Sequence, residues 1–233
     1  MTVEDFKNGQ VILIDKPLQW TSFQVVNKIR WELKQQFNLK KIKVGHAGTL
    51  DPLATGLLIL CTGKFTKKID EFQAQIKEYT GTFTVGATTP SYDLETEIDA
   101  QYPITHINDE LIHQTTTKFI GTIAQKPPIF SAIKKDGKRL YELARAGETT
   151  EIKSRNVHIH TFEITNINLP TIDFKVVCSK GTYIRSLAYD FGKALNSGAH
   201  LTTLRRTKIG DFKVTNAKSI SEFIETLKSS NQI

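Results

Sequence analysis

The apolar residues of this chain recur with two different spacings, which predict both helices and strands. Between residues 21 and 37 they fall at helical intervals, as Phe23, Val26 and Ile29 show. Thr21 or Ser22 can cap the start of this helix, because a side-chain oxygen there can accept a free main-chain N–H. Further helices are predicted over residues 64–75, 108–121, 181–195 and 219–229, with a short one from about Arg139.

Strands are predicted where apolar residues alternate with polar ones or form a short continuous run. In residues 77–87, Tyr79, Phe83 and Val85 share one face. Residues 56–63 are almost wholly apolar, which is typical of a strand buried on both faces. Other strands are predicted over residues 10–17, 156–164 and 171–180, and in part of 199–212. Because short connections separate several strands, we expect an α+β fold with a large, mostly antiparallel mixed sheet flanked by helices.

Composition places the chain among folded proteins and excludes several classes of site. Hydrophobic residues make up 39% of its 233 residues, enough for a core, and no apolar run reaches the roughly 20 residues of a membrane span. The polar N-terminus lacks a signal-peptide core. Cys61 and Cys178 are far apart, which favours a reducing cytoplasm over a disulfide framework. His158 and His160 could share a strand face, but without an evident third ligand we expect no metal site.

The chain is basic, with a net charge of +7 and an isoelectric point of about 9.3. A basic surface is typical of proteins that bind polyanions such as nucleic acids. Many soluble proteins are mildly basic without such a partner, so charge alone leaves this question open.

One carboxylate has an unusual setting, in the stretch VGHAGTLDPLATGLLIL over residues 44–60. Pro52 fixes its own φ and restricts Asp51 to extended backbone, while Gly45 and Gly48 permit turns. These residues hold one acidic side chain in a defined direction beside a buried strand, which is what catalysis by positioning requires. A common Asp-Pro turn beside a hairpin explains the same local features.

Six segments together favour the catalytic interpretation. GHAGTLDPLATGLLILCTGKFTK resembles the signature of the TruB family, the tRNA pseudouridine-55 synthases. DKPLQWTS, KEYTGTFTVGATTPSYD, QKPPIFSAIKKDGKRLYELARAG, CSKGTYIRSLAYDFG and AHLTTLRRTKIGDF resemble further motifs of that family, in the same order. The resemblance runs from residue 15 to about 212 and implies the pseudouridine-synthase fold with an RNA-gripping insertion at about 122–150.

The resemblance also implies roles for individual residues. Asp51 falls on the catalytic aspartate, Tyr79 on the tyrosine that stacks on the target base, and Arg185 on the arginine that pairs with the aspartate. From position alone, Tyr79 could equally be a core tyrosine and Arg185 a surface ion-pair partner. Predicted substrate or RNA contacts are His46, Asp93, Leu204, Lys134, Lys138, Arg139 and Arg205. Three basic clusters, at Lys40, Lys41 and Lys43, at Lys134, Lys135, Lys138 and Arg139, and at Arg205, Arg206 and Lys208, could contact phosphates.

Two residues depart from the family pattern. Gln19 stands where glycine is usual and Phe65 where alanine is usual, so both bear on local packing and neither on a residue with a chemical role. Only residues 211–233 follow Gly210, fewer than the roughly 50 that a domain needs. We therefore expect a single catalytic domain over 1–233 without a separate C-terminal RNA-binding module of the PUA type.

The predicted function is isomerisation of uridine 55 in the T loop of tRNA by a cytoplasmic monomer. The reaction breaks and remakes one glycosidic bond after the base has left its stack, so it needs no cofactor or metal. A tRNA-folding chaperone with incidental catalysis would use the same binding residues, and a guide-RNA-dependent synthase would share the motifs. We rank the guide-dependent alternative below the other two, because such an enzyme normally needs the C-terminal module and protein partners.

Overall fold

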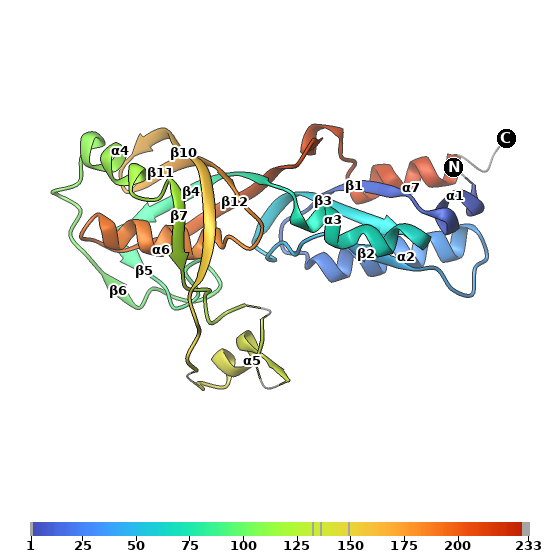
Figure 1. The fold of residues 1–233 in the computed structure, drawn as a ribbon, viewed down its shortest axis with the longest axis horizontal. Coiled ribbons are helices and arrows are strands. Elements are labelled where there is room, and N and C mark those ends of the chain that lie inside the picture. The colour runs from blue at the N-terminus through green and yellow to red at the C-terminus, as the bar shows by residue number, and fades with distance from the viewer. Residues whose placement is uncertain (1, 132, 136, 149, 230–233) are drawn as a thin grey trace. The chain divides into compact units, whose positions relative to one another are not determined.

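A computed structural model describes residues 2–131, 133–135, 137–148 and 150–229 (Figure 1). Contacts divide the chain into two compact units, which are described separately. The terminal unit comprises Met1–Tyr79 and Leu204–Ile233, and the central unit comprises Thr80–Thr203. Both boundaries fall inside strands, namely β4 (Lys77–Val85) and β12 (Ala199–Ile209).

The strands of the terminal unit are arranged around β3. Strand β3 (Ala54–Thr62) pairs antiparallel with β1 (Val11–Lys16) and with β2 (Val44–His46). It also pairs in parallel with β12, where Leu204 lies opposite Ala54 and Arg206 opposite Gly56. A short strand, β13 (Phe212–Lys213), extends the edge of β12. The almost wholly apolar run predicted as a buried strand is therefore the centre of this unit.

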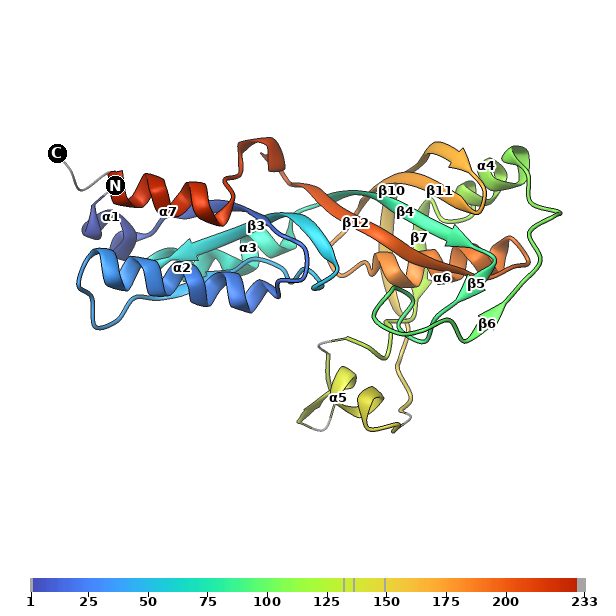
Figure 2. The same ribbon diagram turned by 180° about the vertical axis from the view of Figure 1, so that it is seen from behind.

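Helices cover both faces of this part of the sheet. They are α1 (Val3–Asn8), α2 (Ser22–Gln36), η1 (Gly63–Lys68), α3 (Ile69–Ala74), η2 (Val214–Asn216) and α7 (Ile220–Ser229). Figure 2 shows α2 and α7 on one face of β3 and α3 on the other. Ile29, Leu58 and Phe223 belong to one buried apolar cluster on the first face, and Phe72 packs against the cluster that contains Ile59 on the second. The predicted cap is confirmed, since Gln24 N donates to Thr21 Oγ1 at 3.1 Å.

The central unit is built on four strands in the order β4-β11-β10-β7. Strands β11 (Thr171–Cys178) and β7 (Gly121–Gln125) each pair antiparallel with β10 (Arg155–Asn168). Helix α4 (Asp109–Thr117) contacts β10, and helix α6 (Ile184–Ala194) packs on the sheet through the aromatic ring of Phe191. Phe83 stacks on Phe174 at 4.1 Å between ring centroids, and Phe191 of α6 lies 5.7 Å from Phe83. The small strands β5 (Ala87–Thr88) and β6 (Ala100–Gln101) form a separate pair.

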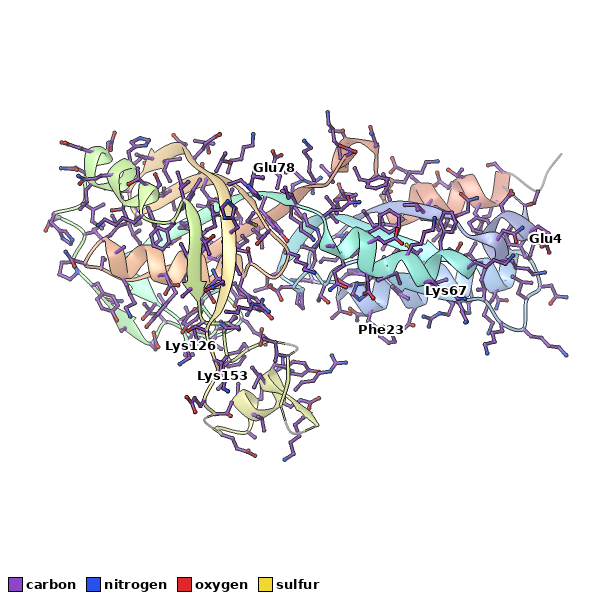
Figure 3. All side chains as sticks on the ribbon, in the orientation of Figure 1. Glu4, Phe23, Lys67, Glu78, Lys126 and Lys153 are labelled. Carbon is purple, nitrogen blue, oxygen red and sulfur yellow. The ribbon has the colours of Figure 1, made fainter. Side chains whose placement is uncertain are left out.

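The insertion lies between β7 and β10 in the chain. It carries β8 (Lys134–Lys135), β9 (Lys138–Arg139) and α5 (Leu140–Arg145), so the helix predicted from about Arg139 is confirmed. Figure 3 labels Lys126 and Lys153, which lie where the chain enters and leaves this segment. Residues 122–125, at the start of the insertion expected at about 122–150, belong to β7 and pair with β10.

The predicted fold class is confirmed: the protein is mixed α/β, with a mostly antiparallel sheet flanked by helices. Residues 64–75 differ in part from the predicted helix, since their first turn is a 3-10 helix. Thr66 Oγ1 donates to Gly63 O at 2.8 Å there. Within the described ranges, no helix is both long enough and apolar enough to cross a membrane.

Candidate active site

Asp51 lies in a loop between β2 and β3 whose main chain is held at every residue. We call residues 48–52 the aspartate loop. Each of its five carbonyl oxygens accepts a hydrogen bond. Arg206 donates to the carbonyls of Gly48 and Thr49, and the Ser22 hydroxyl donates to that of Leu50. The main-chain N–H groups of Ala54 and Gln19 donate to the carbonyls of Asp51 and Pro52. Leu50 N also donates to Ser22 Oγ at 2.8 Å. These hydrogen bonds therefore fix the position of the Asp51 main chain, although the loop belongs to no strand.

Arg206 contacts one side of the aspartate loop. Its Nη2 donates to Gly48 O at 3.0 Å, its Nη1 to Thr49 O at 3.5 Å, and its Nε to Leu57 O at 2.8 Å. The residue is only 1% exposed. The prediction that Arg206 contacts phosphate is therefore wrong, because its guanidinium is buried inside the terminal unit and donates to main-chain carbonyls.

Lys16 contacts the other side of the loop. Its fully buried ammonium donates to Trp20 O at 2.7 Å, to Pro17 O at 2.8 Å and more distantly to Pro52 O at 3.5 Å. Burial lowers the pKa of Lys16 to about 8, and the charge of Asp51 opposes that shift. The protonation state of Lys16 therefore depends on the pH and on the charges of Asp51 and Arg206.

His46 ends β2, just before the aspartate loop. Burial, and then the nearby Arg206 charge, lower the pKa of His46 below its usual value. Its Nδ1 is buried without a hydrogen-bond partner inside the described part of the protein. His46 is therefore mainly neutral at physiological pH, and its buried Nδ1 has no hydrogen-bond partner within the described residues.

The other predicted residues of the terminal unit lie on β4 and β12. Tyr79 is 8% exposed and Leu204 is 9% exposed, so both are buried. The burial of Tyr79 agrees with the core interpretation and leaves its catalytic role a prediction. Arg205 makes a bidentate pair with Asp15, at 2.6 and 3.0 Å, and Nη1 lies 3.3 Å from Thr55 Oγ1.

Arg185 and Asp93 meet in the central unit. Arg185 lies in the first turn of α6, with Nε 3.6 Å from Asp93 Oδ2. Its Nη2 donates to Phe130 O at 2.9 Å and its Nη1 to Ser91 O at 3.3 Å. Because Arg185 is only 3% exposed, the interpretation as a surface ion pair is wrong. The sequence motifs did not indicate that Asp93 is its partner.

The loop that carries Asp93 is held by its own hydroxyl groups. Thr89 Oγ1 and Ser91 Oγ both donate to Asp93 O, at 2.7 and 3.1 Å. Tyr92 has a φ of 64°, in the left-handed region, and its ring stacks on Tyr189 at 4.2 Å. Strained backbone of this kind often occurs at functional sites, where surrounding contacts maintain it.

The predicted phosphate contacts fall into different environments. Lys138 and Arg139 are exposed on β9 of the insertion, and Lys40, Lys41 and Lys43 are exposed before β2. The side chain of Lys134 lies outside the described part of the chain. Within the described ranges, no group of three or more His, Cys, Asp or Glu residues is arranged to hold a metal ion.

Sequence reasoning missed the residues that hold the aspartate loop. Ser22 was considered only as a helix cap, and Arg206 only as a surface cation. The signal for Arg206 was the strand period, because Leu204 and Arg206 must point to the same face of β12. Asp51 and Arg185 belong to different units, so their pairing stays a prediction.

Two family models together match most of the chain. Residues 34–184 match the model described as TruB family pseudouridylate synthase (N terminal domain). Residues 185–231 match the model described as tRNA pseudouridylate synthase B C-terminal domain.

Curated relatives match over nearly their whole length. A protein of Flavobacterium johnsoniae named tRNA pseudouridine synthase B is 70% identical, and the match covers 98% of this chain and all of that protein. A protein of the same name from Phocaeicola vulgatus is 58% identical, with 96% of this chain and 95% of that protein covered.

A solved structure entitled "Crystal Structure of a Cbf5-Nop10-Gar1 Complex" is similar in fold, with a TM-score of 0.71 and 29% identity. The match covers 94% of this chain and 54% of the other. The predicted resemblance and the predicted enzyme class, an isomerase that forms pseudouridine, are confirmed by the family models and the curated relatives. The chain belongs to the TruB family of pseudouridylate synthases.

Proposed function

We propose that this chain isomerises uridine 55 in the T loop of tRNA, with Asp51 as the essential carboxylate. The names of its curated relatives support a tRNA substrate. The target uridine leaves its stack so that its sugar and C5 become accessible, and positive charge helps to offset the few kcal/mol that unstacking costs. Lys138 and Arg139 on the insertion are proposed to supply part of that charge.

The observation that carries this proposal is the aspartate loop. A carboxylate that acts on one sugar carbon must keep its direction while the base detaches, turns and reattaches. Each carbonyl from Gly48 to Pro52 accepts a hydrogen bond, so the main chain beneath Asp51 has little freedom. In the proposed mechanism Tyr79 stacks on the flipped uracil, which is worth about 1–3 kcal/mol for a base.

Asp51→Asn tests the proposal directly. The change keeps the size of the side chain and removes its charge, so the variant should bind tRNA with unchanged affinity and form no pseudouridine. The measurement is carbodiimide primer extension on an unmodified tRNA transcript, with binding followed by filter retention. Asp211→Asn, on an exposed turn of the same unit, is the matched control and should act normally. Pseudouridine formed by Asp51→Asn at the normal rate would refute the role of Asp51.

Arg185 is proposed to orient the Asp51 carboxylate during the reaction. Its planar guanidinium makes several directed contacts, which a lysine cannot reproduce. Arg185→Lys should therefore lower the single-turnover rate strongly while leaving the affinity for tRNA within a few-fold. Lys193→Arg, later in the same helix, serves as the control. A rate equal to that of the unchanged protein would count against the proposed pair.

We also propose that the enzyme works as a cytoplasmic monomer without a cofactor or guide RNA. The isomerisation neither oxidises nor reduces its substrate, and the same atoms leave and rejoin the sugar. Purified chain incubated with a bare transcript and no added RNA or metal should form pseudouridine at one position. Dependence on a second RNA, or modification at another uridine, would contradict this part of the proposal.

A further inference from the structure

We propose that Arg206 is a positioning residue for Asp51. Its buried guanidinium fixes the aspartate loop so that the carboxylate meets the sugar in the correct direction. The inference rests on the proposed role of Asp51, and Arg206 itself touches no substrate.

The contacts of Arg206 are selective for the main chain of the loop. Nη2 and Nη1 reach Gly48 O and Thr49 O, while Nε reaches Leu57 O on strand β3. One planar group therefore ties the loop to the strand that follows it. A carbonyl that is buried without a hydrogen-bond partner destabilises the folded state, so these contacts favour this one geometry of the loop.

Gly56 lets strand β12 approach strand β3 closely at Arg206. The two residues lie opposite each other in the parallel pairing, and a Cβ at Gly56 would clash with the main chain of Arg206. A Cβ at Gly48 would lie 3.6 Å from Nη1, which is an ordinary contact, so glycine there is needed for its φ of 101° and not for space. The close approach at Gly56 brings the Arg206 side chain to the aspartate loop.

Stability alone is a weak reason for a charge at this site. Taking a cation out of water is energetically unfavourable, and packed apolar residues often stabilise a core at least as well. The charge also acts on its neighbours, since Arg206 contributes to the lowered pKa of His46. The selective contacts with the loop below Asp51 are therefore better explained by positioning than by core packing.

Arg30 of helix α2 provides a matched control in the terminal unit. Its Nη2 also donates to a main-chain carbonyl, at 2.9 Å, but that carbonyl belongs to Val44 on β2 and not to the aspartate loop. A general effect of losing an arginine that bonds the main chain should appear at both positions, whereas a positioning effect should appear only at Arg206.

The test compares Arg206→Lys, Arg30→Lys and Asp51→Asn in the full chain. Melting temperature reports folding, filter binding reports affinity for a tRNA transcript, and single-turnover rates at saturating RNA report the chemical step. Arg206→Lys should bind tRNA within about threefold of the unchanged affinity and react about 10²-fold more slowly, the cost of an ångström-scale misplacement. Arg30→Lys should keep its rate within about threefold.

A second variant removes another contact to the same loop. Ser22→Ala deletes the hydroxyl that bonds Leu50, and it should also lower the rate without weakening RNA binding. The proposal is overturned if Arg206→Lys folds and keeps its rate, if its defect lies only in affinity, or if it is unfolded at the assay temperature, which would make Arg206 a folding residue. An active Asp51→Asn would instead refute the proposed function, whatever Arg206 does.

Discussion

Lys16 shows how burial at a single residue controls charge. Its pKa is lowered to about 8 from an ordinary value of 10.5, because the side chain is buried and Arg206 is near. Between these two values the unfolded chain binds more protons than the folded one, so the free energy of unfolding should rise with pH. Below about pH 8 the lysine is charged in both states, and the buried charge then lowers the free energy of unfolding by its full amount.

We predict that the unchanged protein gains stability relative to Lys16→Met as pH rises from about 8 towards 10. The lysine loses its proton only in the folded state over this window, while methionine has none to lose. Urea unfolding at pH 7.5, 9 and 10 measures the difference. Lys67→Met, at an exposed site labelled in Figure 3, should show no such trend. A constant difference for Lys16→Met would contradict the lowered pKa.

Gln19 is a second residue whose position predicts an energetic effect. It has a φ of 64° where the TruB family usually has glycine, and it is exposed. Gln19→Gly should stabilise the protein by up to about 1 kcal/mol, because relief of left-handed strain exceeds the added entropy of glycine. Chemical denaturation measures the change, with Gln35→Gly in helix α2 as a control that should destabilise. Loss of stability in Gln19→Gly would show that the glutamine is not strained.

At the residue scale, the sequence indicated candidate chemical groups but did not indicate the contacts that hold the aspartate loop. Asp51, Arg185 and Tyr79 stand in motifs, and their types match the proposed reaction. The supporting contacts of Ser22 and Arg206 are to main-chain carbonyls, which every residue has, so no side-chain pattern marks their acceptors. Likewise, Arg185 meets Asp93 only because the fold of the central unit brings together two residues that are far apart in the chain.

At the scale of elements, the contact between β3 and β12 depends on Gly56. A side chain there would strain a φ of 104° and clash with the main chain of Arg206. Gly56→Ala should therefore lower the free energy of unfolding by more than the roughly 1–3 kcal/mol of backbone strain alone. Gly147→Ala is the matched control, because its φ is also positive, at 72°, and nothing lies within 4 Å. Equal losses in thermal or urea unfolding of the two variants would show that close packing at Gly56 contributes nothing.

Elements with strong periodicity were predictable, and elements held by distant pairing were not. Residues 21–37 carry both a cap and an apolar stripe, so the helix Ser22–Gln36 follows from local sequence. Strand β7 has a weak pattern of its own and forms because β10 supplies its hydrogen bonds. Phe65, unusual in the family, packs its ring against Gly9 on a remote turn, and that contact lies outside any local pattern.

At the scale of the whole molecule, the net charge of +7 points to an electrostatic contribution to RNA binding. If Lys138 contacts phosphate, Lys138→Ala should reduce the slope of log affinity against log salt by about 1. Titration of tRNA binding between 50 and 200 mM salt, a range of about fourfold, measures this slope. Lys67→Ala removes an equal charge outside the three basic clusters and should leave the slope unchanged. An unaltered slope for Lys138→Ala would remove it from the proposed contact face.

The way the aspartate loop is held has a consequence for protein engineering. The groups that hold the loop donate to its main-chain carbonyl oxygens, and these oxygens do not depend on the side chain at position 51. Reactive or spectroscopic side chains could thus be exchanged at this one position while the scaffold stays constant. Differences in rate between such variants would then reflect the functional group at position 51 and not a rearranged backbone.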